Sequence, residues 1–234
     1  MKLAIMQPYF FPYIGYYQLV KAVDHFIFYD DVNFIKRGWI NRTNIITREG
    51  KQLLSISLSQ SSQNKRINEI ELTGSQDKLL KSIEFTYKRA PFFKDVFPII
   101  ESCFDEQFKL ISEVAAHSIT LVSNYLDFGT EFSFSSEFHR STVGYEKARR
   151  LKDICRKENA DIYINSIGGQ AIYTKEEFES QGIEMFFLKS NNNLHYSQNP
   201  IRKDTFEPSL SIIDVLMFNN RDKVKEMLGN FELV

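Results

Sequence analysis

The 234-residue chain is long enough to bury a hydrophobic core, and its 43% hydrophobic and 25% charged residues exclude a disordered, collagen-like or coiled-coil protein. With 29 Lys plus Arg against 30 Asp plus Glu, the formal net charge of -1 provides no overall field for a nucleic acid, so phosphate would be recognised by a local cluster. Cys103 and Cys155 form no CxxC pair, which predicts reduced, buried thiols in a cytoplasmic protein.

The first third of the chain predicts a βαβ unit followed by a β-hairpin. Residues 2–6 form a short apolar run, residues 14–23 have the spacing of a helix that faces a sheet, and residues 26–29 form a second apolar run. Strand, helix and strand in this order are typical of a βαβ unit and imply parallel pairing. Alternating polar and apolar residues at 39–47 and 53–58, separated by a Gly-containing turn, predict the hairpin. The opening strand is too short for a signal-peptide core.

The middle of the chain has the residue pattern of helices, and in the last third predicted strands alternate with predicted helices. Apolar residues recur with helical period across 75–126, which predicts three helices, the second bent at Pro98. Beyond them we expect strands at 132–134, 161–164 and 184–188, and helices at 144–159, 175–181, 211–218 and 220–228. The predicted fold is a single α/β domain over residues 1–234. It has a mostly parallel, Rossmann-like sheet, a hairpin after the first βαβ unit and a helical insertion at 75–127. No segment approaches the ~20 apolar residues of a membrane span.

Polar and aromatic residues concentrate in four loops that follow predicted strands. These loops are residues 7–9, 30–31, 165–170 and 189–198. Ligands of open parallel α/β sheets bind beyond the carboxyl ends of the strands, where such loops gather. The sequence therefore predicts a site at this edge of the sheet.

The segment that follows the second predicted strand combines carboxylates with cations and the only Trp of the chain. Asp30 and Asp31 are candidates for a general base or for hydrogen bonds to sugar hydroxyls or an amine, although aspartates also favour turns. The cationic residues and the amide that follow would hold a diphosphate, and Trp39 offers a flat face to a base or sugar ring. The alternative is a solvated hairpin with surface ion pairs. The residues with the diphosphate role are Lys36, Arg37, Asn41 and Arg42.

The two later loops supply weaker candidates. Gly168 and Gly169 follow a strand and could present backbone N–H groups to an anion, but a tight glycine turn explains them equally well. His195 is the first candidate among the histidines for an acid or base near neutral pH, although a single histidine is more often structural. The sequence has no HExxH, GxSxG or closely spaced His and Cys, so no metal is expected.

Several aromatic, charged and proline-containing motifs follow one another along the chain. The first is Gln7-Pro8-Tyr9-x-x-Pro12-x-x-Gly15-Tyr16. The later ones are Asp30-Asp31-Val-x-Phe34, Lys36-Arg37-x-Trp39-x-Asn41-Arg42, Tyr87-Lys88-x-x-Pro91-Phe92, Ile154-Cys155, Asp161-x-Tyr163, His195-x-x-Gln198 and Ser209-x-Ser211-Ile-Ile-Asp214. Together they resemble the WbqC-like protein family over nearly the whole chain. Each motif alone is weakly specific, whereas the ordered set is specific.

The resemblance implies a role in bacterial surface polysaccharide biosynthesis, in O-antigen and capsule pathways. Two positions depart from the family pattern: Asn33 stands where glutamine is expected, and Asn165-Ser166 stand where a Ser-Gly pair is usual. A fainter likeness connects residues 12–16 with HIGH-type nucleotidyltransferases. Both histidines of that motif are absent here, so nucleotidyl transfer by that mechanism is not expected.

Three functions remain open from the sequence. The first is a transferase that modifies a nucleotide-linked amino sugar by N-acyl or aminoacyl transfer. The second is a non-catalytic sugar-nucleotide-binding or scaffold protein of the same pathway, in contact with other pathway enzymes. The third is an RNA-binding module, which the near-neutral charge disfavours. The candidate catalytic residues are Asp30, Asp31 and His195, and the candidate substrate-binding residues are Gln7, Tyr9, Lys36, Arg37, Trp39, Asn41, Arg42, Tyr87, Lys88, Gly168, Gly169, Tyr196 and Gln198.

The transferase hypothesis needs a second substrate and no cofactor. N-acyl transfer requires a positioned amine and a polarised acyl carbonyl, which a protein provides without a metal. The acyl donor would be acyl-CoA, an acyl carrier protein or an aminoacyl donor, and the sequence does not discriminate among them. The oligomeric state is likewise left open.

Overall fold

The fold is built on one mostly parallel sheet, as the sequence predicts. The computed structural model describes residues 1–104, 108–191, 195–198 and 206–234. Within them, six strands pair in the order β5-β2-β1-β6-β7-β8. The pairs are parallel except β7 with β8, which is antiparallel. The strands are β1 (Lys2–Met6), β2 (His25–Phe28), β5 (Glu131–Phe134), β6 (Ile162–Ser166), β7 (Glu184–Ser190) and β8 (Phe231–Leu233).

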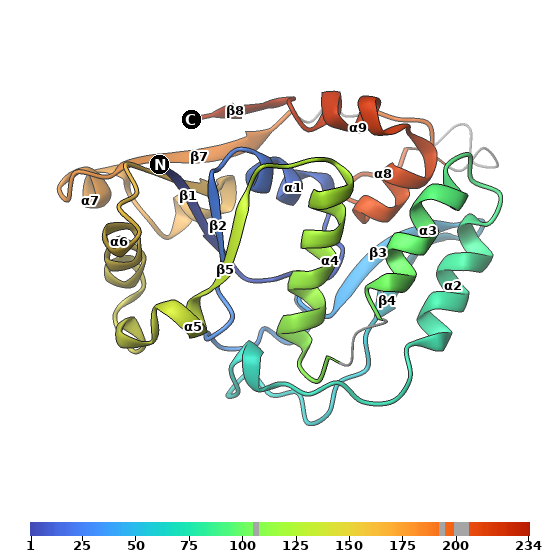
Figure 1. Ribbon diagram of the computed structural model, residues 1–234, viewed down its shortest axis with the longest axis horizontal. Helices are drawn as coiled ribbons and strands as arrows, with labels where there is room; N and C mark the ends of the chain where they lie inside the picture. Colours follow the sequence, from blue (N-terminus) through green and yellow to red (C-terminus); the bar gives the residue numbers. More distant parts are fainter. Residues whose placement is uncertain (105–107, 192–194, 199–205) are drawn as a thin grey trace.

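Helices cover both faces of this sheet (Figure 1). One face carries α1 (Ile14–Lys21), α4 (Ile111–Tyr125), α8 (Ile212–Phe218) and α9 (Arg221–Met227). The other face carries α6 (Lys147–Lys157) and α7 (Lys175–Glu179), which pack on residues such as Ile5, Tyr163 and Phe187. Further short helices lie between these elements: η1 (Ile67–Glu69), α5 (Ser135–Phe138), η2 (Arg140–Thr142) and η3 (Ile167–Ala171).

The first two helices of the insertion and the hairpin lie beside the sheet, whereas the third helix, α4, packs on it (Figure 1). The insertion has three helices, as predicted: α2 (Asp77–Tyr87), α3 (Phe93–Ser102), which contains Pro98, and α4. The hairpin consists of β3 (Arg42–Thr47) and β4 (Gly50–Ser55). Its apolar residues join the same core as α1 and α4, in which each buried large side chain contributes roughly 1.5–3 kcal/mol.

Three of the four predicted limits of the hairpin strands were wrong by three residues. Residues 39–41 precede β3 instead of forming it, and β4 starts at Gly50, directly after a two-residue turn. Backbone pairing continues past the strand ends, where the Ile56 N–H donates to the Asn41 carbonyl at 2.8 Å. The alternating polar and apolar pattern of the sequence therefore extends beyond the strands. The terminal strand β8 was not predicted, since three residues carry no readable period and only pairing with β7 makes them a strand.

Candidate functional site

The helices that connect successive strands change from one face of the sheet to the other between β1 and β6. From β1 the chain proceeds to β2 and β5 through helices on one face, and from β6 it proceeds to β7 through α7 on the other face. The loops after β1 and β6 therefore leave their strands toward opposite faces, and ligands of such folds bind at this point of the carboxyl edge. Residues 7–13 follow β1 at this point, and residues 167–171 follow β6.

The aromatic loop of residues 7–13 is held in one conformation by buried hydrogen bonds. Phe11 has a left-handed backbone (φ 38°), which is costly for a residue with a side chain. Its carbonyl accepts hydrogen bonds from Thr43 Oγ1 at 2.9 Å and from Ser211 Oγ at 2.7 Å, and its N–H donates to Ser118 Oγ at 3.0 Å. Three elements, β3, the N-terminus of α8 and α4, thus fix the loop from different parts of the sequence.

A cavity of about 290 Å³ lies between this loop, the segment before β3 and the N-terminus of α8. Trp39 and Tyr13 are 45% and 42% exposed, so their rings form accessible walls. The Trp39 carbonyl accepts the Phe10 N–H at 3.2 Å, which ties the Trp segment to the loop. We call this space the aromatic cavity; its lining residues are Tyr9, Pro12, Tyr13, Trp39, Arg42, Thr43, Asn44, Ser209 and Ser211.

The groups around the aromatic cavity suit a polar, ring-shaped ligand. Burial raises the pKa of both Tyr9 and Tyr13, so both phenols stay neutral and able to donate hydrogen bonds. Arg42 supplies a fixed positive charge, and its Nε donates to the Gly38 carbonyl at 3.0 Å. Within the described part of the chain, the cavity lining contains no carboxylate and no imidazole. The cavity can therefore bind and orient a ligand, and a base would have to come from outside it.

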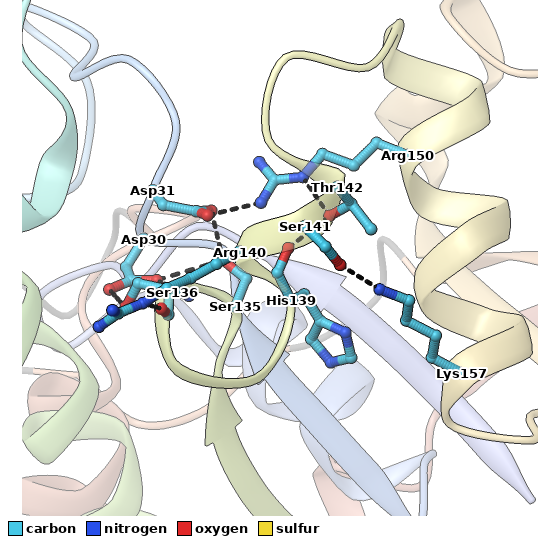
Figure 2. Close-up of polar contacts among 10 residues, drawn as sticks. All are labelled: Asp30, Asp31, Ser135, Ser136, His139, Arg140, Ser141, Thr142, Arg150 and Lys157. Atoms are coloured by element: carbon cyan, nitrogen blue, oxygen red, sulfur yellow. Dashed lines mark hydrogen bonds and ion pairs between the residues drawn. The ribbon is translucent and has the colours of Figure 1, made fainter.

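Asp30 and Asp31 lie in a different place, a buried polar cluster at the ends of β2 and β5 (Figure 2). The Asp30 carboxylate accepts hydrogen bonds from the Ser136 N–H at 3.0 Å and from Ser136 Oγ at 2.6 Å. Ser135 Oγ donates to Asp31 at 2.5 Å and lies 3.2 Å from Asp30. The neighbouring strands β2 and β5 bring these residues together although they are more than 100 positions apart in the sequence.

Arg150 of α6 neutralises Asp31 inside this cluster (Figure 2). Its Nη2 lies 2.6 Å from Asp31 Oδ2, and both side chains are almost fully buried. Its Nε donates to Thr142 Oγ1 at 3.0 Å, and its guanidinium lies 4.7 Å from the centroid of the Tyr29 ring. Asp31 is thus engaged in an ion pair that connects α6 to the sheet edge.

Among the described residues, no cation forms an ion pair with Asp30 as Arg150 does with Asp31. Burial raises the pKa of Asp30, while the hydrogen bonds from Ser136 act in the opposite direction. A carboxyl with a raised pKa exchanges a proton more easily near neutral pH than an ordinary aspartate does. Of the two adjacent aspartates, Asp30 is therefore the better candidate for acid–base chemistry.

Tyr87 and the predicted residues of the 195–198 segment belong to a third group. Tyr87 and Tyr196 donate to the two carboxylate oxygens of Asp214 at 2.8 and 2.9 Å. The Gln198 side chain bonds the backbone of Glu207, and the His195 ring lies 4.6 Å from the ring of Phe206. None of these side chains lines the aromatic cavity. Roles of Tyr87, Tyr196, Gln198 and His195 in binding or catalysis stay predictions.

The cationic and amide candidates also lie in different parts of the structure. Lys36 and Arg37 are exposed on the segment that carries Trp39. Asn41 is buried at the base of the hairpin, where its Nδ2 donates to the Ile56 carbonyl at 2.9 Å. Lys88 lies at the end of α2, outside the aromatic cavity. The structure thus brings Tyr9, Trp39 and Arg42 together in one cavity and places the other candidates elsewhere.

The candidates that directly follow β1 and β6 lie at the carboxyl edge of the sheet. Gln7 is half-buried, and its carbonyl accepts the Tyr16 hydroxyl at 2.8 Å. A side chain at position 169 would collide with Asn165, whose Cγ lies 2.9 Å from the ideal Cβ position. Gly168 has open space around it. Close packing against Asn165 therefore explains Gly169, and the anion-binding role of Gly168 stays a prediction.

Sequence reasoning missed five residues of the buried polar cluster and its surroundings. They lie between residues 135 and 150, a region without a motif whose last part, from residue 144, is predicted as the start of a helix: Ser135, Ser136, His139, Thr142 and Arg150. Burial lowers the pKa of His139, although its Nε2 lies 2.9 Å from Glu158. A useful signal was the Ser135-Ser136 pair directly after a predicted strand, because that position lies at the same sheet edge as Asp30.

Residues 1–104, 108–191, 195–198 and 206–234 contain no group of three or more His, Cys, Asp or Glu side chains arranged to hold a metal ion. In the same part of the chain, every helix is too short or too polar to cross a membrane.

Comparison with known proteins gives one family and one relative. The profile of the WbqC-like protein family matches residues 7–226. The uncharacterized protein Rv1507c of Mycobacterium tuberculosis (strain ATCC 25618 / H37Rv) is 26% identical over 222 residues, which cover 93% of each chain. No solved structure matches the chain. The match to the family spans the aromatic loop, the buried polar cluster and the Asp214 group alike.

Proposed function

The chain belongs to the WbqC-like protein family, and from this premise we propose that it binds a nucleotide-linked amino sugar of bacterial surface polysaccharide biosynthesis. The observation that carries the proposal is the aromatic cavity. Small-molecule sites usually measure ~300–1,000 Å³, so a cavity of about 290 Å³ suits one sugar ring and leaves the nucleotide outside.

The residues in and around the aromatic cavity support a ligand whose sugar ring lies inside the cavity and whose nucleotide lies outside it. Trp39 offers an indole face to the sugar ring, and Tyr9 and Tyr13 offer hydroxyl groups that stay neutral. Lys36 and Arg37 are exposed on the same segment as Trp39, where they can approach the diphosphate outside the cavity. Arg42 lines the cavity itself and would bind the phosphate next to the sugar.

Replacing Trp39 with alanine is expected to weaken sugar-nucleotide binding at least tenfold. The exposed ring contributes contact area to the ligand and little to the core, so the unfolding temperature of the free protein should change by at most a few degrees. The measurement is calorimetric titration with a panel of UDP- and dTDP-linked amino sugars, supported by the thermal shift that a native-state ligand causes.

Leu53→Ala is the matched control, because Leu53 is equally exposed on β4 and lies outside the cavity lining. It should leave the affinity unchanged. Wild-type protein that binds no sugar nucleotide, or Trp39→Ala protein that binds one with full affinity, would contradict the assignment of the aromatic cavity.

A second candidate function is N-acyl or aminoacyl transfer to the bound sugar amine. The observation in its favour is Asp30, a carboxyl whose pKa is raised by burial and which lies just beyond β2, the neighbour of the strand that leads into the aromatic loop. Such a group can accept the proton that the amine loses during transfer. Without that step the protein would be a sugar-nucleotide carrier or scaffold for other enzymes of the pathway.

Asp30→Asn separates transfer from binding. The amide keeps an oxygen for the Ser136 N–H but cannot take a proton, so sugar-nucleotide affinity should stay within about twofold while pathway output falls ~100-fold or more. Output is measured as the modified surface polysaccharide of a bacterium whose own gene is deleted and replaced by the variant. Asp222→Asn, at an exposed carboxylate of α9, is the control. Full output from the Asp30→Asn strain would remove the catalytic version and leave the carrier.

A further inference from the structure

A second concave site lies between the hairpin and α2, away from the aromatic cavity. Its volume is about 950 Å³. One wall is the end of the hairpin, with Thr47 and Gln52, and the other is one face of α2 together with Phe218 at the end of α8. We call it the basic groove; its charged and aromatic lining residues are Arg48, Glu49, Lys81, Phe85, Lys88, Arg89 and Phe218.

The basic groove is positively charged, which suits a negatively charged, phosphorylated ligand. Four of its lining residues are cations and a single one, Glu49, is an anion, whereas the whole chain has a formal net charge of -1. Among the described residues, no carboxylate forms an ion pair with Arg48, Lys81, Lys88 or Arg89. Positive charge that is concentrated in a concavity and not neutralised by the protein attracts anions.

The groove also exposes an aromatic face. Phe85 is 75% exposed on α2, one helical turn after Lys81 and one before Arg89. The Lys88 ammonium lies 5.3 Å from the centroid of the Phe85 ring. A large apolar ring held in water by the fold is typical of a contact surface, and a ring flanked by cations suits a ligand that combines an aromatic base with phosphate groups.

We propose that the basic groove binds the phosphorylated adenosine of an activated acyl donor, the part that coenzyme A thioesters and acyl adenylates share. The proposal rests on the proposed transfer to a sugar amine, which needs a separate place for each substrate. A volume of about 950 Å³ lies within the range of small-molecule sites, and concave walls on both sides favour a nucleotide over a flat protein partner. The several negative charges of such a donor complement the free cations of the groove.

The hairpin connects the groove to the aromatic cavity. Asn44 lines the cavity and Thr47 lines the groove, and three residues of a strand span about 10 Å. The two sites are therefore neighbours along β3. In the transfer, the sugar nitrogen forms a bond with the acyl carbon, and the bond from that carbon to the donor's sulfur or phosphate oxygen breaks. The leaving group keeps the electron pair, and the proton of the nitrogen passes to the base.

Titration of the full chain with coenzyme A and, separately, with ATP tests the proposal. The first probe reports a thioester donor and the second an adenylate. The wild type is expected to bind one of them, more weakly as salt rises. Phe85→Ala should weaken that binding at least tenfold, and Lys81→Glu with Arg89→Glu at least a hundredfold. Phe138→Ala and Lys94→Glu, at an exposed phenylalanine and an exposed lysine outside the groove, should leave it unchanged.

Three results would overturn the proposal: no binding of coenzyme A or ATP, equal binding by wild type and groove variants, or competition by UDP or dTDP for the same site. The last result would make the groove part of the sugar-nucleotide site. Binding of the sugar nucleotide to the groove variants is measured in parallel and should equal that of the wild type. Groove-dependent coenzyme A binding without any sugar-nucleotide binding would contradict the proposed function alone, so the two failures are distinguishable.

Discussion

Replacing Arg150 with methionine is expected to lower the free energy of unfolding by about 3–5 kcal/mol. Arg150 and Asp31 form an ion pair of 2.6 Å in which both side chains are almost fully buried. Methionine keeps most of the volume of the side chain but removes the charge, so the Asp31 carboxylate is left buried without the Arg150 counter-ion. Thr142 Oγ1 also loses its guanidinium donor. The loss is large because an uncompensated buried charge costs more than the intact pair contributes.

Chemical denaturation at neutral pH measures this effect. Arg149→Met is the matched control, because Arg149 is exposed on the same helix and its ion pair with Asp153 is long, at 3.9 Å. It should change the free energy of unfolding by less than about 1 kcal/mol. The double replacement Arg150→Met with Asp31→Asn should recover part of the loss, since no charge remains unpaired. A loss of under 1 kcal/mol for Arg150→Met alone would show that Asp31 finds another partner.

Asp214 is expected to make the stability of the protein fall as pH rises from about 4 to above 6. Burial raises the pKa of Asp214 to about 6, against the hydrogen bonds from Tyr87 and Tyr196, which lower it. In the unfolded chain the same carboxyl titrates near ~3.9. Between these values the folded protein holds a proton that the unfolded chain has lost. The stabilisation from this proton is fully present below pH ~4 and is lost as pH passes the folded value.

The size of the effect follows from the shift. Two pKa units correspond to about 3 kcal/mol, so the wild type should lose about 3 kcal/mol relative to Asp214→Asn between pH 4 and pH 8. Denaturation curves at unit steps of pH, taken for both proteins, measure the difference. Glu84→Gln, at an exposed position of α2, should run parallel to the wild type. A constant difference between wild type and Asp214→Asn across this range would show that Asp214 titrates normally.

The order of strands and helices was predictable because most elements have a period of their own. The apolar runs of β1, β2, β6 and β7 and the helical spacing of the 75–126 region are local patterns, and the structure confirms them. The hairpin limits were less predictable, because a backbone hydrogen bond between Asn41 and Ile56 extends the pairing beyond the strands. The terminal strand β8 depends entirely on its neighbour β7.

The residues of the candidate site were likewise predictable only in part. Tyr9, Trp39 and Arg42 belong to motifs that stand out in the sequence, and they share the aromatic cavity. The different surroundings of Asp30 and Asp31 could not be inferred from two adjacent identical residues. Arg150 lies 119 positions from Asp31, and the serines that bind Asp30 lie more than 100 positions away.

The sequence by itself determined the α/β class, the parallel sheet edge and the aromatic loop, because these depend on the period and chemistry of residues that are close along the chain. Only the tertiary structure decided which aspartate is paired, which candidates share a cavity and that the face of α2 closes a basic groove. Those properties depend on burial and on charges brought together from distant segments, and the local pattern of a chain does not contain them.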